Sequence, residues 1–155
     1  ERAAATGGGF RLGAVWAAGA WRPERSAPFA LIERLAAVPG VQLVSLQHGA
    51  PARDVERSAW RASIETPTMG AQSVVETASL IRRLDLVLTV DTMVAHLAGA
   101  LAAPVWTLLH AEADWRWMVG RNDSPWYPTM RLFRQKRTGI WDDVLEEVLA
   151  ALPAA

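Results

Sequence analysis

The sequence has no cysteine and only one lysine, Lys136, among its 155 residues. Without cysteine the chain has no disulfide framework, no thiolate metal site and no cysteine nucleophile. The single lysine does not stand in a Walker A phosphate loop, and the GxGxxG dinucleotide fingerprint is also missing. The sequence therefore disfavours a P-loop NTPase and a dinucleotide-dependent oxidoreductase.

Excess charge of one sign and long hydrophobic runs are also lacking. The 16 basic residues balance the 16 acidic ones, so no broad electrostatic field favours nucleic acid or an anionic membrane. No apolar run reaches the roughly 18 residues expected of a membrane-spanning helix, and no secretory signal opens the sequence. We expect neither nucleic-acid binding nor a membrane span.

The sequence does contain enough apolar material for one ordinary domain. Hydrophobic residues make up 51% of the chain, and we assign residues 10–155 to a single domain. Residues 1–9 have low complexity and no initiating Met, which predicts a linker or an added remnant, and we expect a fragment of a longer protein. The eight tryptophans suit pockets and interfaces as well as cores, because each indole N–H needs a partner.

Short apolar segments alternate with amphipathic helical patterns along the chain. Strands are predicted at residues 11–16, 41–47, 62–65, 85–90, 104–110 and 130–133. Helices are predicted at residues 29–38, 52–60, 73–84, 92–102 and 140–152. Because nearly continuous apolar strands alternate with helices, the fold class is α/β, a Rossmann-like doubly wound parallel sheet.

Ligands of such sheets bind beyond the carboxyl ends of the strands, near a switch point in strand order. Four junctions qualify: residues 17–19, 47–49, 91–92 and 110–114. At residues 91–92 a helix is predicted to begin directly after a buried strand. Its unpaired N–H groups and positive dipole end would suit a phosphate, so this junction is the most informative.

Spacing alone leaves the roles at this junction open. Asp91 is either only the N-cap of the helix, in which case its carboxylate competes with phosphate, or a group that accepts from a ligand hydroxyl while Thr92 is the cap. The predicted sheet-facing stripe of this helix consists of Val94, Leu97, Ala98 and Leu101. His96 lies nearly opposite that stripe, beside Met93 and Ala100. It is therefore either a ligand-facing side chain or an ordinary surface or hydrogen-bonded histidine.

A second candidate region is rich in tryptophan, with the segments DWRW at residues 114–117 and DSPWYP at residues 123–128. Trp115 could stack on a base or sugar, and Arg116 could pair with a phosphate. The alternative is a rigid lid that packs on its own domain. The basic group formed by Arg131, Arg134, Lys136 and Arg137 is most simply a solvated face.

The residues also resemble a family. DLVLTVDTMVAHLAGALAAPVWTLL, residues 85–109, is similar to the DxVxxxDTxxxHLAxALxxPVWxLL segment of glycosyltransferase family 9, whose best-known members are the lipopolysaccharide heptosyltransferases. The stretch DWRWM to RLFRQ, the VSLQHG segment and the Arg25-Ser26 pair resemble the subgroup that carries tetratricopeptide repeats. The match runs from about Phe10 to Leu152.

The resemblance implies the C-terminal half of a GT-B fold that binds a nucleotide-sugar donor, such as an ADP-heptose-like one. It implies that the missing N-terminal half binds the acceptor and supplies the general base, and that no metal or other cofactor is needed. A cytoplasmic location goes with it, or a peripheral one at the inner membrane. The site residues that it implies are Asp91, Thr92, Met93, Val94 and His96 around the diphosphate, with the base and ribose near Gln47-His48 and residues 110–114. Gly19, Trp115 and Arg116 are further candidate contacts, from the strand-end rule and the tryptophan-rich region.

Two segments depart from the family pattern. In the family the loop after the first strand usually carries WAGNP or a basic residue, whereas here it is WAAGAW. The segment before DWRW is commonly PFAP, whereas here it is HAEA, which would place Glu112 near the donor. These departures leave the donor and the activity open. The alternative function is a non-catalytic interaction module on a degenerate Rossmann scaffold, which would expose Trp115 and Trp126 and fill the crevice at Asp91.

Overall fold

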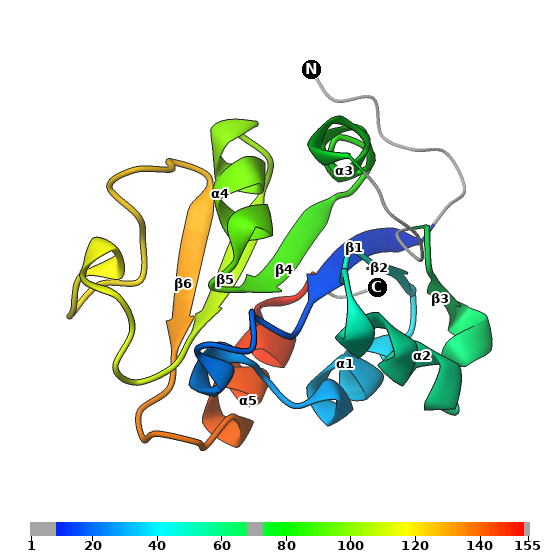
Figure 1. Ribbon diagram of the computed structural model, residues 1–155, viewed down its shortest axis with the longest axis horizontal. Helices are drawn as coiled ribbons and strands as arrows, with labels where there is room; N and C mark the ends of the chain where they lie inside the picture. The colour runs from blue at the N-terminus through cyan, green and yellow to red at the C-terminus, as the bar shows by residue number, and fades with distance from the viewer. Residues whose placement is uncertain (1–8, 68–72, 154–155) are drawn as a thin grey trace.

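Six parallel strands form one sheet in the computed structural model, which describes residues 9–67 and 73–153 (Figure 1). Their order across the sheet is β3-β2-β1-β4-β5-β6, and every neighbouring pair is parallel. The strands are β1 (Phe10–Val15), β2 (Val41–Ser45), β3 (Ile64–Glu65), β4 (Leu86–Val90), β5 (Val105–Leu109) and β6 (Met130–Arg134). This is the predicted doubly wound sheet, and its order reverses between β1 and β4.

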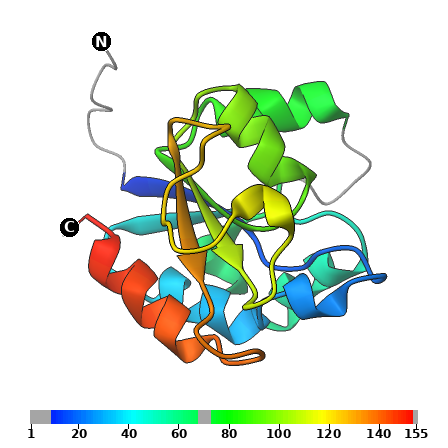
Figure 2. The same cartoon turned by 90° about the vertical axis from the view of Figure 1, so that its left-hand side faces the viewer.

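Helices cover both faces of the sheet (Figures 1 and 2). One face packs against α1 (Phe29–Ala36), α2 (Asp54–Arg57) and α5 (Asp142–Ala151), and the other packs against α3 (Val74–Ile81) and α4 (Met93–Ala100). β4 shows why two covered faces need an apolar strand. Leu86 and Leu88 point into the first core and Val87 into the second, because successive side chains alternate across a strand.

Local signals predicted some element ends well. The capping box that begins α3 is confirmed: the Ser73 hydroxyl accepts from the Glu76 amide, and the Glu76 carboxylate accepts from the Ser73 amide at 2.8 Å. The helix predicted at residues 52–60 was too long, since a 3-10 turn at Ala50–Arg53 precedes a single α turn that ends before Ser58. The linker predicted at residues 1–9 lies outside the described residues except for Gly9.

The predicted orientation of α4 was only partly correct. Val94 and Ala98 face the core as expected, but Ala95 and Gly99 are buried as well, whereas Leu97 is only partly buried. The burial extends to one side because the segment between β5 and β6, residues 110–129, folds over that side of α4. Within the described ranges, no helix is long and apolar enough to cross a lipid bilayer.

Candidate functional site

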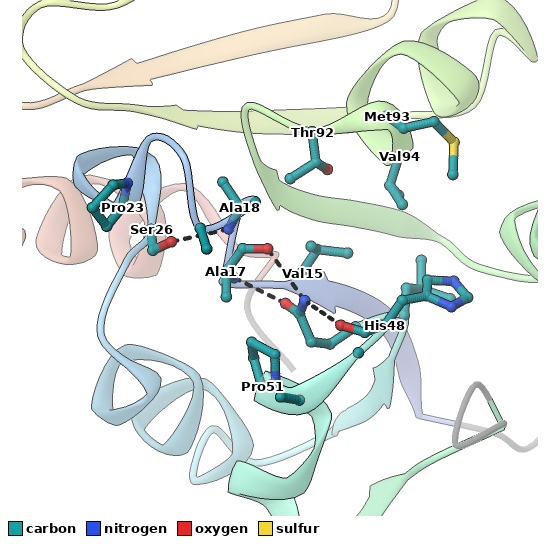
Figure 3. A pocket seen from close by; sticks show the side chains of 16 residues that line it. Val15, Ala17, Ala18, Pro23, Ser26, His48, Pro51, Thr92, Met93 and Val94 are labelled. Atoms are coloured by element: carbon teal, nitrogen blue, oxygen red, sulfur yellow. Dashed lines mark hydrogen bonds between the residues drawn. The ribbon is translucent and has the colours of Figure 1, made fainter. Parts of the chain in front are cut away.

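A cavity of about 620 Å³ opens at the carboxyl edge of the sheet, where the strand order reverses (Figure 3). Its walls come from the loop after β1, the segment after β2 and the beginning of α4, and most of its lining side chains are apolar or glycine. The lining residues are Val15, Ala17, Ala18, Gly19, Ala20, Pro23, Ser26, Leu46, Gln47, His48, Gly49, Ala50, Pro51, Thr92, Met93 and Val94. The volume lies within the roughly 300–1,000 Å³ range of small-molecule sites.

A smaller and more polar cavity of about 230 Å³ adjoins the first one. Gly19, Thr92 and Met93 line both cavities, so the two form one continuous site. The other lining residues of the smaller cavity are Arg25, Asp91, His96 and Arg116. The crevice at Asp91 is thus open and polar, contrary to what the interaction-module hypothesis expects.

The beginning of α4 settles the question of the cap. Thr92 is the N-cap residue by its extended backbone, with φ −138° and ψ 175°, but its hydroxyl contacts the Thr89 hydroxyl at 3.1 Å and caps nothing. The Ala95 amide donates to the Thr92 carbonyl and is therefore not available to a ligand. Met93 and Val94 remain as the first two helical residues, whose N–H groups have no partner within a helix.

Asp91 is not the cap; it forms an ion pair. Its carboxylate lies 3.5 Å from the Arg25 guanidinium, and the two side chains are 4% and 16% exposed. The Trp21 ring lies against the other side of Arg25, with 4.9 Å between the guanidinium carbon and the ring centroid. The loop after β1 is folded back by a hydrogen bond from the Ala18 amide to the Ser26 hydroxyl (Figure 3).

Arg25 is therefore a site residue that we did not predict as one. Its only sequence signal was its membership of the Arg25-Ser26 pair in the family resemblance. It reaches Asp91 from a 3-10 turn (Pro23–Arg25) that local patterns did not predict. The position of an isolated turn depends on tertiary contacts, which explains why spacing could not reveal the pair.

His96 is half-buried, with 32% of its side chain exposed, and its ring is held on two sides. Nδ1 lies 3.0 Å from the Tyr127 hydroxyl, and the ring stacks on Trp117 at 5.3 Å between centroids. Nε2 faces the Asp91 carboxylate at 4.0 Å. Burial lowers the pKa of His96 below its usual value, which the Asp91 charge opposes, and the net shift favours the neutral ring.

The tryptophan-rich region both packs and protrudes. Trp117 is fully buried against α4, as the lid interpretation expects, whereas Trp115 is 77% exposed and lies outside the lining of both cavities. Arg116 lines the smaller cavity, and its guanidinium is paired with Asp114 at 2.8 Å. Arg134 is not part of a solvated face: it donates to the Trp117 and Met118 carbonyls and so anchors this region.

Gln47 and His48 both line the larger cavity, but in different ways. The Gln47 carbonyl oxygen accepts from the Trp16 and Ala17 amides at 3.0 and 2.9 Å, and its amide group donates to the Ala17 and His48 carbonyls. Gln47 therefore holds the loop after β1 in place and shapes the cavity wall. His110 and Glu112 do not line either cavity, since His110 is 2% exposed and Glu112 points to solvent.

Among the described residues, no cluster of three or more histidine or carboxylate side chains has the geometry to hold a metal ion. The donor groups that the site offers a ligand include two backbone N–H groups, the imidazole and two paired guanidinium groups. All of them are suited to oxygen anions.

Comparison with known proteins supplies further findings. The family model for glycosyltransferase family 9 (heptosyltransferase) matches residues 30–138, which is more than half of the chain. Protein FlbA of Caulobacter vibrioides (strain ATCC 19089 / CIP 103742 / CB 15) is 29% identical over 153 residues. These cover 94% of this chain and 25% of FlbA, so the chain spans about a quarter of that relative's length.

Solved structures of heptosyltransferases share the fold. E. coli heptosyltransferase WaaC with ADP-2-deoxy-2-fluoro heptose aligns with a TM-score of 0.64 and 19% identity, over 92% of this chain and 43% of WaaC. E. coli ADP-heptose lps heptosyltransferase II gives a TM-score of 0.64 and 17% identity, over 94% of this chain and 47% of that one. WaaC with ADP aligns with a TM-score of 0.65 and 19% identity, over 95% of this chain and 45% of WaaC. The chain thus matches less than half of each enzyme.

Proposed function

The chain belongs to glycosyltransferase family 9 (heptosyltransferase), and on that premise we propose that it is the donor-binding half of a GT-B glycosyltransferase. The two adjoining cavities would bind the nucleoside diphosphate part of a nucleotide sugar. An ADP-heptose-like donor is the first candidate, because WaaC, which shares the fold, has been solved with ADP and with ADP-2-deoxy-2-fluoro heptose. The acceptor would be bound by the other half of such an enzyme.

The beginning of α4 is the observation that carries this proposal. The Met93 and Val94 amides lie at the positive end of the helix, in residues that line the larger cavity, and Met93 also lines the smaller one. Free N–H groups at a helix N-terminus form a ready anion site. In the proposed complex the diphosphate lies where the two cavities meet and accepts from these amides.

Arg25 makes such a site electrostatically feasible. The buried Asp91 carboxylate lines the same cavity and by itself would repel a diphosphate. The Arg25 guanidinium neutralises it at 3.5 Å, and Arg116, whose charge is likewise balanced by Asp114, adds further N–H donors at the rim. With both guanidinium groups in place, the dipole of α4 and the N–H groups set the local potential.

The larger cavity would take the uncharged part of the donor. Its lining of alanine, glycine, proline and valine residues suits the flat face of a base, and Gly49, with φ 76°, lets the chain turn sharply beside it. His48 stands at this wall, half-buried, where it can contact a base or ribose. The continuity of the two cavities through Thr92 and Met93 matches a ligand with one apolar and one anionic end.

In the proposed reaction the leaving nucleoside diphosphate gains negative charge as the sugar departs. The amides at the start of α4, His96 and Arg116 would stabilise that charge, so we propose a reaction that needs no metal. Deprotonation of the acceptor hydroxyl would fall to the other half of the enzyme. The lone domain would then bind the donor without turning it over.

The test is a thermal-shift assay with ADP, GDP and UDP at millimolar concentration. We expect at least one of them to raise Tm, because a ligand that binds only the folded state stabilises it. His96→Ala should abolish that shift relative to its own ligand-free Tm, while Arg34→Ala, on a distant exposed ion pair with Glu146, should retain it. No shift with any of the three would contradict the proposal.

The interaction-module alternative has one supporting observation. Trp115 and Trp126 are 77% and 54% exposed, as a docking surface would require. That hypothesis also requires a filled crevice at Asp91, and the crevice is open. The site therefore favours donor binding.

A further inference from the structure

The ring of His96 is fixed by residues from a different part of the chain. Trp117 stacks on it with an interplanar angle of 21°, and Tyr127 lies edge-on with its hydroxyl 3.0 Å from Nδ1. Both come from the segment between β5 and β6, whereas His96 belongs to α4. The two aromatic contacts leave Nε2 directed at Asp91, in the smaller cavity.

The charges around the ring favour one position for its proton. The Asp91 carboxylate faces Nε2 at 4.0 Å, and a lone pair on Nε2 would be repelled by that charge. A proton on Nε2 would be attracted, which leaves Nδ1 as the acceptor for the Tyr127 hydroxyl. Arg116 and Asp114, the other charged groups that act on His96, are paired with each other.

Gly99 provides an independent sign that the position of Tyr127 is specified. Glycine inside a helix costs about 1 kcal/mol relative to alanine, yet α4 carries one here. A Cβ built at this position would lie 2.4 Å from Cγ of Tyr127. Only glycine lets the tyrosine ring lie against α4, one turn from His96.

We propose that Tyr127 is a positioning residue that holds His96 as the Nε2–H tautomer, with this N–H directed into the smaller cavity as a donor to an anionic ligand oxygen. Tyr127 acts through His96 and does not line the cavity. The identity of the ligand rests on the proposed function, whereas the tautomer is a property of the protein itself. Trp117 fixes the plane of the ring, and Tyr127, with the Asp91 charge on the opposite side, fixes its proton.

The experiment is long-range ¹H–¹⁵N NMR of the histidine rings at pH 7.5 without ligand, where the two tautomers give distinct ¹⁵N shifts. The chain has three histidines, and the His96→Gln variant identifies the signals of His96. We expect the Nε2–H pattern for His96 in the wild type. In Tyr127→Phe, which keeps the ring but loses the hydroxyl, both nitrogen shifts should move toward the average of the two tautomers.

A second variant keeps the inference testable if Tyr127→Phe folds poorly. Gly99→Ala should displace the Tyr127 ring and give the same change at His96, while the signals of His48 and His110 stay in place. An Nδ1–H pattern in the wild type, or no change at His96 in either folded variant, would overturn the proposal.

Nucleotide binding separates this inference from the proposed function. If ADP binds the wild type, Tyr127→Phe should weaken its affinity about three- to tenfold, as expected for loss of an ordered donor (about 0.5–1.5 kcal/mol). If ADP, GDP and UDP all fail to bind while the tautomer pattern is as expected, the proposed function is wrong and the role of Tyr127 stands.

Discussion

The junction between β4 and α4 and the segment between β5 and β6 contribute to the same site in opposite ways. The junction is two residues long and supplies groups that a ligand can contact directly: backbone N–H groups, a carboxylate and, one turn later, an imidazole. The segment at residues 110–129 is long and irregular, and it acts mainly by packing on α4 and orienting those groups. A short junction can thus provide the chemistry only because a longer segment fixes its geometry.

Removal of Trp117 is the strongest way to test this division, because it is predicted to affect folding. Its fully buried indole belongs to the core cluster that includes Val94, Ala95 and Ala98 of α4. Trp117→Ala should lower the free energy of unfolding by about 3–5 kcal/mol, measured by urea denaturation. Trp115→Ala, two residues away and 77% exposed, is the matched control and should change it by less than about 0.5 kcal/mol. Equal effects would show that the segment does not support the domain.

Met93→Pro tests the junction without disturbing the fold. Proline is tolerated at the first position of a helix, and Thr92 before it is already extended. The substitution removes one N–H that we assign to the diphosphate, so calorimetric titration should show about tenfold weaker nucleotide binding (about 1.4 kcal/mol). Met93→Ala removes the same side chain but keeps the N–H, and it should bind nearly as the wild type does. Equal losses in both variants would place the role in the side chain.

The smallest expected effect is a dependence of stability on pH at His110, where the second segment begins. Burial, and then the positive charge of Arg22, lower the pKa of His110 below its usual value of about 6.5. The unfolded chain therefore binds more protons than the folded one below that pH, and stability is lost as pH falls through about 6.5. Denaturation between pH 7.5 and 5.5 should show a shallower slope for His110→Leu, by at most about 1.4 kcal/mol per pH unit. Parallel slopes would show that folding does not change the pKa of His110.

The same contrast explains which features could be predicted from the sequence. The order of strands and helices, the capping box at Ser73 and the helix start after Asp91 depend on neighbours within a few residues. Apolar periodicity, capping patterns and the alternation of apolar strands with helices were sufficient to predict these features. The position of the site followed as well, because the switch point of a doubly wound sheet fixes where loops converge.

The features that escaped prediction depend on contacts between distant residues. Arg25 meets Asp91 from 66 positions away, and Tyr127 meets His96 from 31 positions away. A helical wheel placed His96 on an outer face because it contains no information about a later segment that covers that face. Gln47 looked like a ligand group because only the folded loop after β1 shows that its amide is already used.

The pairing of β1 with β4 has a consequence for how the domain assembles. On one side β1 pairs with β2, the next strand along the chain. On the other side it pairs with β4, and there Leu12 lies opposite Leu86, a residue more than 70 positions later in the sequence. The β1–β4 pair is therefore a non-local seam that joins the β3-β2-β1 half of the sheet to the β4-β5-β6 half. Gly19 and Thr92 line the cavities from opposite sides of the seam. A ligand bound between them would connect the two halves of the sheet, and amide hydrogen exchange along β1 and β4 would then slow.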